Sequence, residues 1–435
     1  MNVTGRGRER VAVLGGGVTG IAAGRASGGK VFESDTTAGG IYASYYMFPG
    51  DPQHYFSRPK TSGWYRFERG GGHWIFGGDP AVLRLFERMA GTKRYSRRSS
   101  VRLDDGRLVP FPLQDHLRQL DPPLPANILS EAATAGSGGQ TMAESHRRRF
   151  GSTLFELFFR PFHERYTAGL YDQIAPQDDY KTPVDVKRMI RGALNQAEAV
   201  GYNTTFLYPT DGLDSLVAKL GEGVPIEYAK RCVTVDLKTK ELHFADGSCA
   251  GYDSLISTLP LPIVLAQTGL ETEATPDPYT GVVVLNIGAC RGDRCPDDHW
   301  IYVTRSKGMF HRVGFYTNVD GHFAPMDDAR RRVGLYVERA FPGGTRLTPS
   351  EIEHYRQTTI AELQDWGMIG DVEVCDVSTV DVAYTWQWKE SGWRGEALKL
   401  LDQQGVLQVG RYARWVFQGI ADSVRDGLMA GATLR

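Results

Sequence analysis

The sequence has almost no excess charge and little cysteine. Its 435 residues carry 50 basic and 51 acidic side chains, so the formal net charge is −1. A chain without a basic excess presents no global field to nucleic acid or to an anionic membrane. The five cysteines stand in no metal-ligand spacing, which favours a reducing compartment without disulfides or structural zinc. We therefore expect a protein with no nucleic-acid partner.

Long apolar runs are also missing. Arg6, Arg8 and Arg10 precede the apolar residues 11–24 and resemble the start of a secretory signal, but five glycines within that run weaken any helix there. No run reaches the ~20 apolar residues that cross a bilayer. The sequence predicts a cytoplasmic protein without a membrane partner. Its composition, 41% hydrophobic and 23% charged, is that of an ordinary globular chain.

The first 33 residues predict a βαβ unit. Residues 11–14 form an apolar run suited to a buried strand, residues 21–26 suit a helix, and residues 30–33 suit a second strand. The helix should be short, because little sequence separates the two strands. Such a unit begins many parallel sheets in α/β proteins.

A glycine motif occupies the turn of this unit. Gly15, Gly17 and Gly20 have the Gly-x-Gly-x-x-Gly spacing, between a strand and a helix, and Glu33 ends the next strand. Glycines at this spacing let the backbone approach a pyrophosphate, and the helix N-terminus offers free N–H groups. An acidic residue in the place of Glu33 accepts hydrogen bonds from a ribose. The motif therefore predicts a dinucleotide site.

Later segments predict a different architecture. Several β-type runs between residues 224 and 339, with few helices among them, favour an antiparallel sheet. Residues 154–159 predict a buried helix that ends at Pro161. The proline- and glycine-rich residues 120–140 predict an exposed connection. Thr348 and Glu351 form a capping box that predicts a helix through residue 363.

Eight landmarks, in order along nearly the whole chain, resemble those of the UDP-galactopyranose mutase family. They are Gly39-Gly40, Gly-Gly-His-Trp-Ile-Phe at 71–76, Val-Pro-Phe-Pro-Leu-Gln at 109–114, Leu-Phe-Glu-Leu-Phe-Phe-Arg-Pro at 154–161, Tyr-Pro-Thr-Asp-Gly at 208–212, Ser-Thr-Leu-Pro at 257–260, Phe-His-Arg at 310–312, and Gly-Arg-Tyr-Ala-Arg-Trp at 410–415. The wider flavin amine-oxidase group shares the first and last of them.

The resemblance implies an α/β fold in three parts: a Rossmann-type FAD-binding domain, an inserted helical domain and an antiparallel β-sheet domain. On this chain the expected boundaries are 1–78 with 205–265 and 403–435 for the FAD-binding domain, 79–204 for the mainly helical domain, and 266–402 for the sheet domain that binds substrate. It also implies an isomerase that interconverts the pyranose and furanose forms of a nucleotide-diphosphate hexose without net oxidation. Family members use reduced FAD as the nucleophile.

Matched residue by residue, the resemblance assigns roles to named side chains. His73 corresponds to the histidine beside the flavin ring, and Arg312 to an arginine that grips the substrate diphosphate. The second diphosphate arginine is Arg188 or Arg191, and the alignment leaves both open. The expected cofactor-binding residues are Gly15, Gly17, Gly20, Glu33, Gly40, Gly72, Gly410, Arg411, Asp422 and Ser423.

Phe417 departs from the family pattern, and three other functions stay open. Phe417 stands where the mutases usually carry a tyrosine whose hydroxyl touches the substrate phosphate. The alternatives are a flavin-independent mutase that uses a divalent metal such as Mg²⁺ or Mn²⁺, an FAD-dependent oxidase or desaturase, and a non-catalytic protein that binds nucleotide sugars. The metal ligands, the nucleotide base, the sugar and the oligomeric state stay open.

Overall fold

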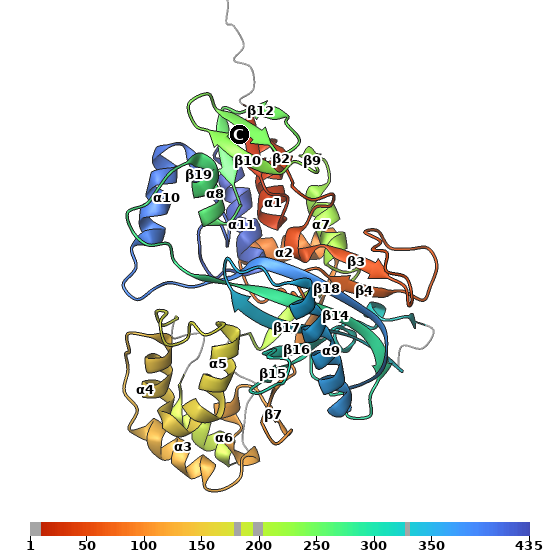
Figure 1. Cartoon of the computed structure of the whole chain (residues 1–435), viewed down its shortest axis with the longest axis vertical. Helices are drawn as coiled ribbons and strands as arrows, with labels where there is room; N and C mark the ends of the chain where they lie inside the picture. Colours follow the sequence, from red (N-terminus) through yellow and green to blue (C-terminus); the bar gives the residue numbers. More distant parts are fainter. Residues whose placement is uncertain (1–9, 178–183, 195–202, 327–330) are drawn as a thin grey trace, which may run out of the picture.

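The fold has three parts, and a central sheet lies between the other two. The computed structural model describes residues 10–177, 184–194, 203–326 and 331–435. Figure 1 shows the long strands β14 (Tyr279–Arg291) and β18 (Ile369–Thr385) crossing the middle of the molecule. A parallel sheet with its helices lies on one side of them, and a group of helices lies on the other. The expected mixed α/β fold class is confirmed.

A five-stranded parallel sheet forms the first part. Its order is β19-β13-β1-β2-β9, and every neighbouring pair is parallel. The strands span Val11–Leu14 (β1), Lys30–Phe32 (β2), Ile226–Glu227 (β9), Ser254–Ser257 (β13) and Val406–Gln408 (β19). Segments far apart in the sequence therefore build one sheet, as in Rossmann-type folds.

Two helices pack together against this sheet. The first, α1 (Val18–Ser27), has ten residues, so the expected short helix is confirmed, although it begins three residues earlier than predicted. Gly17 is its N-cap, and the left-handed Gly28 ends it. The second is α11 (Ile420–Ala432), near the end of the chain. Cβ atoms on Gly427 and Gly431 would lie 2.2 and 2.3 Å from the carbonyl oxygens of Thr19 and Ala23, so only glycine permits this close packing.

The central sheet has seven strands in the order β18-β14-β17-β16-β15-β6-β7. All neighbouring pairs are antiparallel except β15 and β6. The remaining strands span Ser99–Arg102 (β6), Leu108–Pro110 (β7), Trp300–Val303 (β15), Arg312–Phe315 (β16) and Arg332–Pro342 (β17). β6 and β7 lie within the segment expected to be mainly helical, and the domain boundaries stay a prediction. α9 (Pro349–Asp365) begins with the predicted capping box of Thr348 and Glu351.

Helices α3 to α6 form the third part. They span Leu124–Ala133 (α3), Met142–Leu154 (α4), Arg160–Tyr166 (α5) and Val186–Ala193 (α6), and they share one apolar cluster with Val101 of β6 and Val109 of β7. The prediction of an exposed connection over residues 120–140 is wrong for α3. Pro123 precedes that helix and Pro125 lies in its first turn, where a missing N–H costs nothing.

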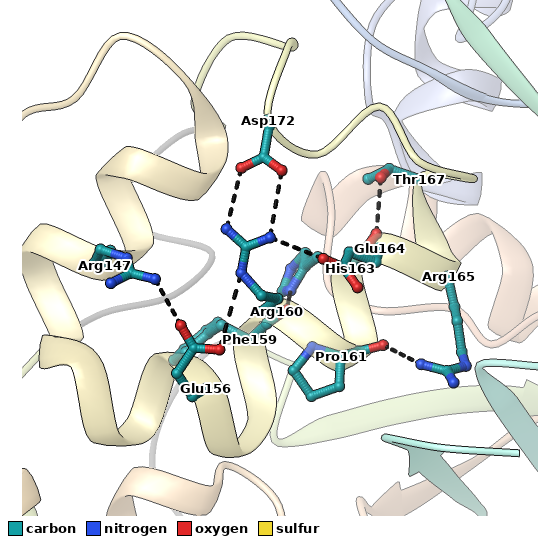
Figure 2. A network of polar contacts seen from close by, with 10 residues as sticks. All are labelled: Arg147, Glu156, Phe159, Arg160, Pro161, His163, Glu164, Arg165, Thr167 and Asp172. Carbon is teal, nitrogen blue, oxygen red and sulfur yellow. Dashed lines mark hydrogen bonds and ion pairs between the residues drawn. The ribbon is translucent and has the colours of Figure 1, made fainter.

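The prediction that a helix ends at Pro161 is also wrong. A π-helical turn, Phe155–Phe159, follows α4 directly, and α5 continues with Pro161 in its first turn. A proline there lacks only an N–H that a helix start leaves unpaired. Figure 2 shows Arg160 extending from this junction toward the carboxylates of Asp172, Glu164 and Glu156, which ties α5 to its neighbours.

The other elements complete the described chain. They are α2 (Pro80–Ala90), α7 (Leu213–Gly221), α8 (Leu261–Thr268), α10 (Trp393–Gln403), the pair β3 (Ser44–Met47) and β4 (Tyr65–Glu68), the pair β5 (Thr92–Ser96) and β8 (Thr205–Pro209), and the small sheet β10 (Cys232–Asp236), β11 (Glu241–Phe244) and β12 (Cys249–Gly251). All five cysteines are free thiols. Within the described ranges, no helix has both the length and the apolar character needed to span a membrane. A cytoplasmic location stays a prediction.

Candidate functional site

The glycine motif forms a tight turn between β1 and α1. Gly15 has a φ of +98°, and a Cβ on Gly20 would lie only 1.9 Å from the Gly15 carbonyl oxygen. Both positions therefore require glycine. A Cβ on Gly17, in contrast, would meet nothing within 4 Å. Open space thus lies before the first turn of α1, whose N–H groups have no side-chain cap.

Glu33 and Gly40 lie directly against this turn. The Gly16 N–H donates to Glu33 Oε2 at 2.6 Å, and the Asp35 N–H donates to Oε1 at 2.8 Å. The Glu33 carboxylate therefore fixes the turn itself, and a contact with ribose stays a prediction. A Cβ on Gly40 would lie 3.6 Å from Gly17 Cα, so Gly40 adjoins the open space.

The N-terminus of α11 is the second uncapped helix end. Its N-cap is Gly419, which provides no side-chain hydrogen bond, and Asp422 lies in the first turn. The Ser423 N–H donates to the Gly419 oxygen at 3.0 Å, and the Ser423 side chain is buried. A Cβ on Gly410 would lie 2.7 Å from Thr19, so Gly410 packs against the start of α1. The two helix ends thus belong to one packed unit.

A cavity of about 380 Å³ lies where the three parts of the fold meet. Among the expected site residues, it is lined by Gly72, His73, Arg188, Arg312, Arg411, Phe417 and Asp422. It is not lined by Gly15, Gly17, Gly20, Glu33, Gly40, Gly410, Ser423 or Arg191. Its volume lies in the range of pockets that take small molecules.

His73 lies on the cavity wall as a neutral imidazole. Burial lowers the pKa of His73 to about 4. Nδ1 lies 2.9 Å from the carbonyl oxygen of Gly71, which can only accept, so Nδ1 carries the proton and Nε2 is an acceptor. The ring edge packs on Tyr42.

Behind His73 lies a fully buried carboxyl group, Glu68, which sequence reasoning did not single out. The His73 backbone N–H donates to Glu68 Oε2 at 3.1 Å, and the Tyr208 hydroxyl donates to Oε1 at 2.6 Å. Burial raises the pKa of Glu68 to about 8, although these hydrogen bonds and nearby Arg66 oppose the shift. Glu68 therefore holds the backbone of the His73 loop in place.

Arg312 is paired with a carboxylate that sequence reasoning also missed. Its Nε and Nη2 donate to Glu338 at 3.0 and 2.6 Å, and Nη2 also contacts the Tyr384 hydroxyl. Burial alone raises the pKa of Glu338, but the guanidinium outweighs it and lowers that pKa to about 2. The sequence signal that could have identified Glu338 is that it is a single acidic residue in the apolar strand β17.

The structure separates the two candidate arginines of α6. Arg188 lines the cavity and pairs with Asp115, whereas Arg191 lies on the exposed face of the helix. Burial raises the pKa of Asp115 even though Arg188 opposes this. Arg97, which also lines the cavity, donates to the Phe111 oxygen at 3.2 Å.

Arg411 connects the cavity with the end of α11. Its Nη1 donates to the Gln418 oxygen at 3.2 Å and its Nη2 to the Ala383 oxygen at 3.3 Å, while the buried Nε has no hydrogen-bond partner among the described residues. The Phe417 ring lies 4.7 Å from the guanidinium carbon and is 44% exposed.

These residues fit a dinucleotide cofactor. Two uncapped helix ends, open space beside Gly17, and an unpartnered donor on Arg411 are what an anionic pyrophosphate needs. A metal centre has no such support: in the described part of the chain, no group of three or more His, Cys, Asp or Glu side chains could hold an ion.

The chain matches one protein family and several solved structures. The family model for flavin containing amine oxidoreductases matches residues 30–288, more than half of the chain. No curated protein sequence matches significantly.

Several solved structures share the fold. A reduced UDP-galactopyranose mutase matches with a TM-score of 0.81 and 19% identity, covering 98% of this chain and 93% of its own. A proposed protoporphyrinogen oxidase from Exiguobacterium sp. 255-15 matches at 0.71 and 16% identity, covering 99% of both chains. A CLA-producing fatty acid isomerase from P. acnes matches at 0.61 and 16% identity, covering 97% of both. One fold thus serves a mutase, an oxidase and an isomerase.

Proposed function

Because the chain belongs to the family of flavin-containing amine oxidoreductases, it is an enzyme of the flavin oxidoreductase superfamily, and we propose that it is an FAD-dependent nucleotide-sugar mutase. The proposed reaction interconverts the pyranose and furanose forms of a nucleotide-diphosphate hexose without net oxidation. The observation that carries this proposal is the meeting of Arg312 and Arg188, from the sheet and from the helices, in the cavity that His73 also lines.

The charges of the cavity favour an anionic substrate. Its described lining holds four arginines, Arg97, Arg188, Arg312 and Arg411, against three carboxylates, Asp115, Glu338 and Asp422. A guanidinium binds phosphate oxygens in pairs of charge-assisted hydrogen bonds. A cationic amine, the substrate of an amine oxidase, would instead meet arginine side chains, and the most buried carboxylate, Glu338, is already neutralised by Arg312.

In this proposal Arg312 and Arg188 bind the two phosphates from opposite walls. Glu338 fixes the Arg312 guanidinium in one orientation through two of its nitrogens. Asp115 contacts Arg188 through one nitrogen, Nη2, and burial raises the pKa of this carboxyl group. A diphosphate that replaces the Asp115 contact would release that carboxylate, so we expect Arg188 to adjust on binding more than Arg312 does.

The glycine turn, Gly40, Gly410, Arg411 and the α11 N-terminus would hold FAD. Reduced FAD supplies a nucleophile for the sugar when it is bound. His73 stays neutral at physiological pH because of its lowered pKa, so its Nε2 offers an acceptor without adding positive charge to the site.

The test has two stages. The purified protein, reconstituted with FAD, should show a flavin absorption spectrum. After reduction by dithionite it should convert UDP-galactose or another nucleotide hexose into an isomer of identical mass with a five-membered ring. Hydrogen peroxide formed in step with turnover would contradict the proposal and support an oxidase. Tight nucleotide-sugar binding without any isomer would support a non-catalytic binding protein.

The two arginines of α6 provide a matched pair of variants. Arg188→Ala should weaken nucleoside-diphosphate binding by about tenfold or more, the usual cost of a charged hydrogen bond. Arg191→Ala should leave it unchanged, because Arg191 does not line the cavity. Equal affinities of the two variants would remove Arg188 from the proposed site.

A further inference from the structure

His311 belongs to the cavity lining and has two buried ring nitrogens without hydrogen-bond partners among the described residues. It immediately precedes β16 and Arg312, lines the cavity and is 1% exposed. Among the described residues, neither Nδ1 nor Nε2 has a hydrogen-bond partner. Buried polar groups in native proteins nearly always have one, and the exceptions require a reason. A cavity wall supplies that reason, because a bound molecule can provide the missing partners.

The neighbouring carboxylate does not satisfy His311. Nε2 lies 3.6 Å from Glu338 Oε2, which is beyond hydrogen-bond distance. Both Glu338 oxygens already accept from Arg312, at 2.6 Å for Oε1 and at 2.5 and 3.0 Å for Oε2. A small movement toward Glu338 would still leave Nδ1 without a partner.

The chemistry of the ring selects the kind of partner. Burial lowers the pKa of His311, with Glu338 opposing the shift, so the imidazole is neutral at physiological pH. A neutral imidazole presents one donor and one acceptor. A hydroxyl group matches it, because a hydroxyl also donates and accepts, whereas a phosphate at neutral pH mainly accepts.

The surroundings of His311 suit a sugar ring. Its ring packs near Phe162 and Tyr166 of α5, with centroid distances of 6.0 and 5.3 Å, and both residues line the cavity. Aromatic walls with few polar groups are typical of sites that orient a small ligand through a small number of hydrogen bonds. None of the expected FAD contacts lies on β16 or α5. His311 is thus next to the proposed diphosphate ligand Arg312 and on the helical side of the cavity.

We propose that His311 is a specificity-determining residue that hydrogen-bonds a hydroxyl group of the hexose. This inference rests on the proposed nucleotide-sugar substrate. It assigns to the sugar a contact that neither Arg312 nor Arg188 supplies, since those side chains are directed to the phosphates.

The first test compares binding of a nucleotide with binding of its sugar conjugate. Affinities for UDP and UDP-galactose, and for GDP and GDP-mannose, are measured by calorimetry with the full chain. The His311→Phe variant keeps the aromatic packing and removes both nitrogens. This variant should weaken binding of the sugar nucleotide about tenfold more than binding of its nucleoside diphosphate, which is the scale of one hydrogen bond. An unchanged ratio, or an equal loss for both ligands, overturns the inference.

A matched control is His146→Phe. His146 is buried beside Phe150 and Phe159, but it does not line the cavity and its Nδ1 pairs with the Tyr171 hydroxyl. The same chemical change there should leave the ratio of the two affinities at its wild-type value. A change as large as that of His311→Phe would show that the effect is not specific to the cavity and overturn the inference.

The second test needs no variant to bind ligand. In protein labelled with ¹⁵N-histidine, the His311 ring signals are assigned as those missing from His311→Phe. UDP-galactose or GDP-mannose should shift them, UDP or GDP should shift them less because they reach His311 only through Arg312 and Glu338, and FAD alone should not shift them. A shift with FAD alone overturns the inference and places His311 at the cofactor. Failure of the wild type to bind any of the four nucleotides overturns the proposed function, whereas binding with an unaffected His311 overturns the inference alone.

Discussion

The glycine-rich region at the parallel sheet and the charged wall of the cavity are built by different means. On the side of the parallel sheet, glycines bring backbone against backbone, open space lies before the uncapped start of α1, and the uncapped start of α11 lines the cavity. On the side of the central sheet and the helices, charged pairs such as Arg312 with Glu338 and aromatic rings of α5 form the wall. The first side tolerates no added atom at several positions, while the second can change its side chains within the same fold. We expect cofactor binding to depend on the first and substrate choice on the second.

The largest loss of stability should follow from replacing Arg312 in the charged wall of the cavity. Arg312→Leu leaves Glu338, which is 2% exposed, without its partner and should cost about 3–5 kcal/mol of unfolding free energy. The double variant Arg312→Leu/Glu338→Leu should regain most of that stability but still not bind nucleoside diphosphate. Urea denaturation and calorimetry measure the two effects. A single variant as stable as the wild type would show that the pair is not a unit.

Acid should break the same ion pair, because it protonates Glu338. The pKa of Glu338 is lowered from its ordinary value of 4.5 to about 2 in the folded chain, so the ionised Glu338 stabilises the fold above pH 4.5. That contribution is lost as the pH falls from 4.5 toward 2. The double variant should therefore lose less stability than the wild type over this interval.

The next largest effect concerns the loop of His73, which lies between the two sides. Glu68 has its pKa raised from 4.5 to about 8, so the unfolded chain releases this proton at lower pH than the folded chain does. The stability of the wild type should fall as the pH rises from 4.5 to 8, by an amount on the order of a few kcal/mol. Glu68→Gln should remove this part of the pH dependence. Thermal unfolding at pH 5 and pH 8 measures it, and identical slopes for both proteins would contradict the role of Glu68.

A smaller effect is expected from the glycine side. Gly20→Ala places a Cβ 1.9 Å from the Gly15 oxygen and should lower the free energy of unfolding by about 1–3 kcal/mol. The same variant should lose FAD binding. The control is Gly17→Ala, whose Cβ would meet no protein atom within 4 Å. It should keep wild-type stability and weaken FAD binding, because its methyl group enters the open space before α1. If both variants bind FAD normally, the cofactor does not lie at this turn.

The smallest effect tests whether the charged side can gain a contact. Phe417→Tyr adds a hydroxyl beside Arg411 at the rim of the cavity, and it should strengthen nucleoside-diphosphate binding a few-fold, as an exposed hydrogen bond to phosphate would. Phe56→Tyr is the control, since Phe56 is equally exposed, at 44%, and does not line the cavity. An unchanged affinity in Phe417→Tyr would place the diphosphate away from this ring.

The same division explains what the sequence could predict. The turn at Gly15 to Gly20 follows from local backbone sterics, so spacing alone indicated it, and the capping box at Thr348 is equally local. Glu338 and Glu68 could not be placed, because their partners come from distant segments. The choice between Arg188 and Arg191 needed the orientation of α6.

Two predictions that rested on prolines, the exposed connection over residues 120–140 and the helix end at Pro161, failed for a related reason. Prolines ordinarily end helices, yet Pro161 follows a π-helical turn and Pro125 occupies a first turn. In both places the apolar cluster shared by α3 to α6 determines the outcome, and that packing has no local signature in the sequence.

The close packing of α11 on α1 links the assembly of the site to the order of protein synthesis. The first strand and helix leave the ribosome early, but Gly410, Gly427 and Gly431 reach them only after almost all other described residues have been made. Until then, the apolar surface of α1 lacks its neighbour, and one of the two helix ends proposed to hold FAD does not yet exist. N-terminal units commonly fold during translation, whereas this one has to wait for distant contacts, which slow folding. FAD added to cells or to a refolding mixture should therefore assist a late step of folding rather than an early one.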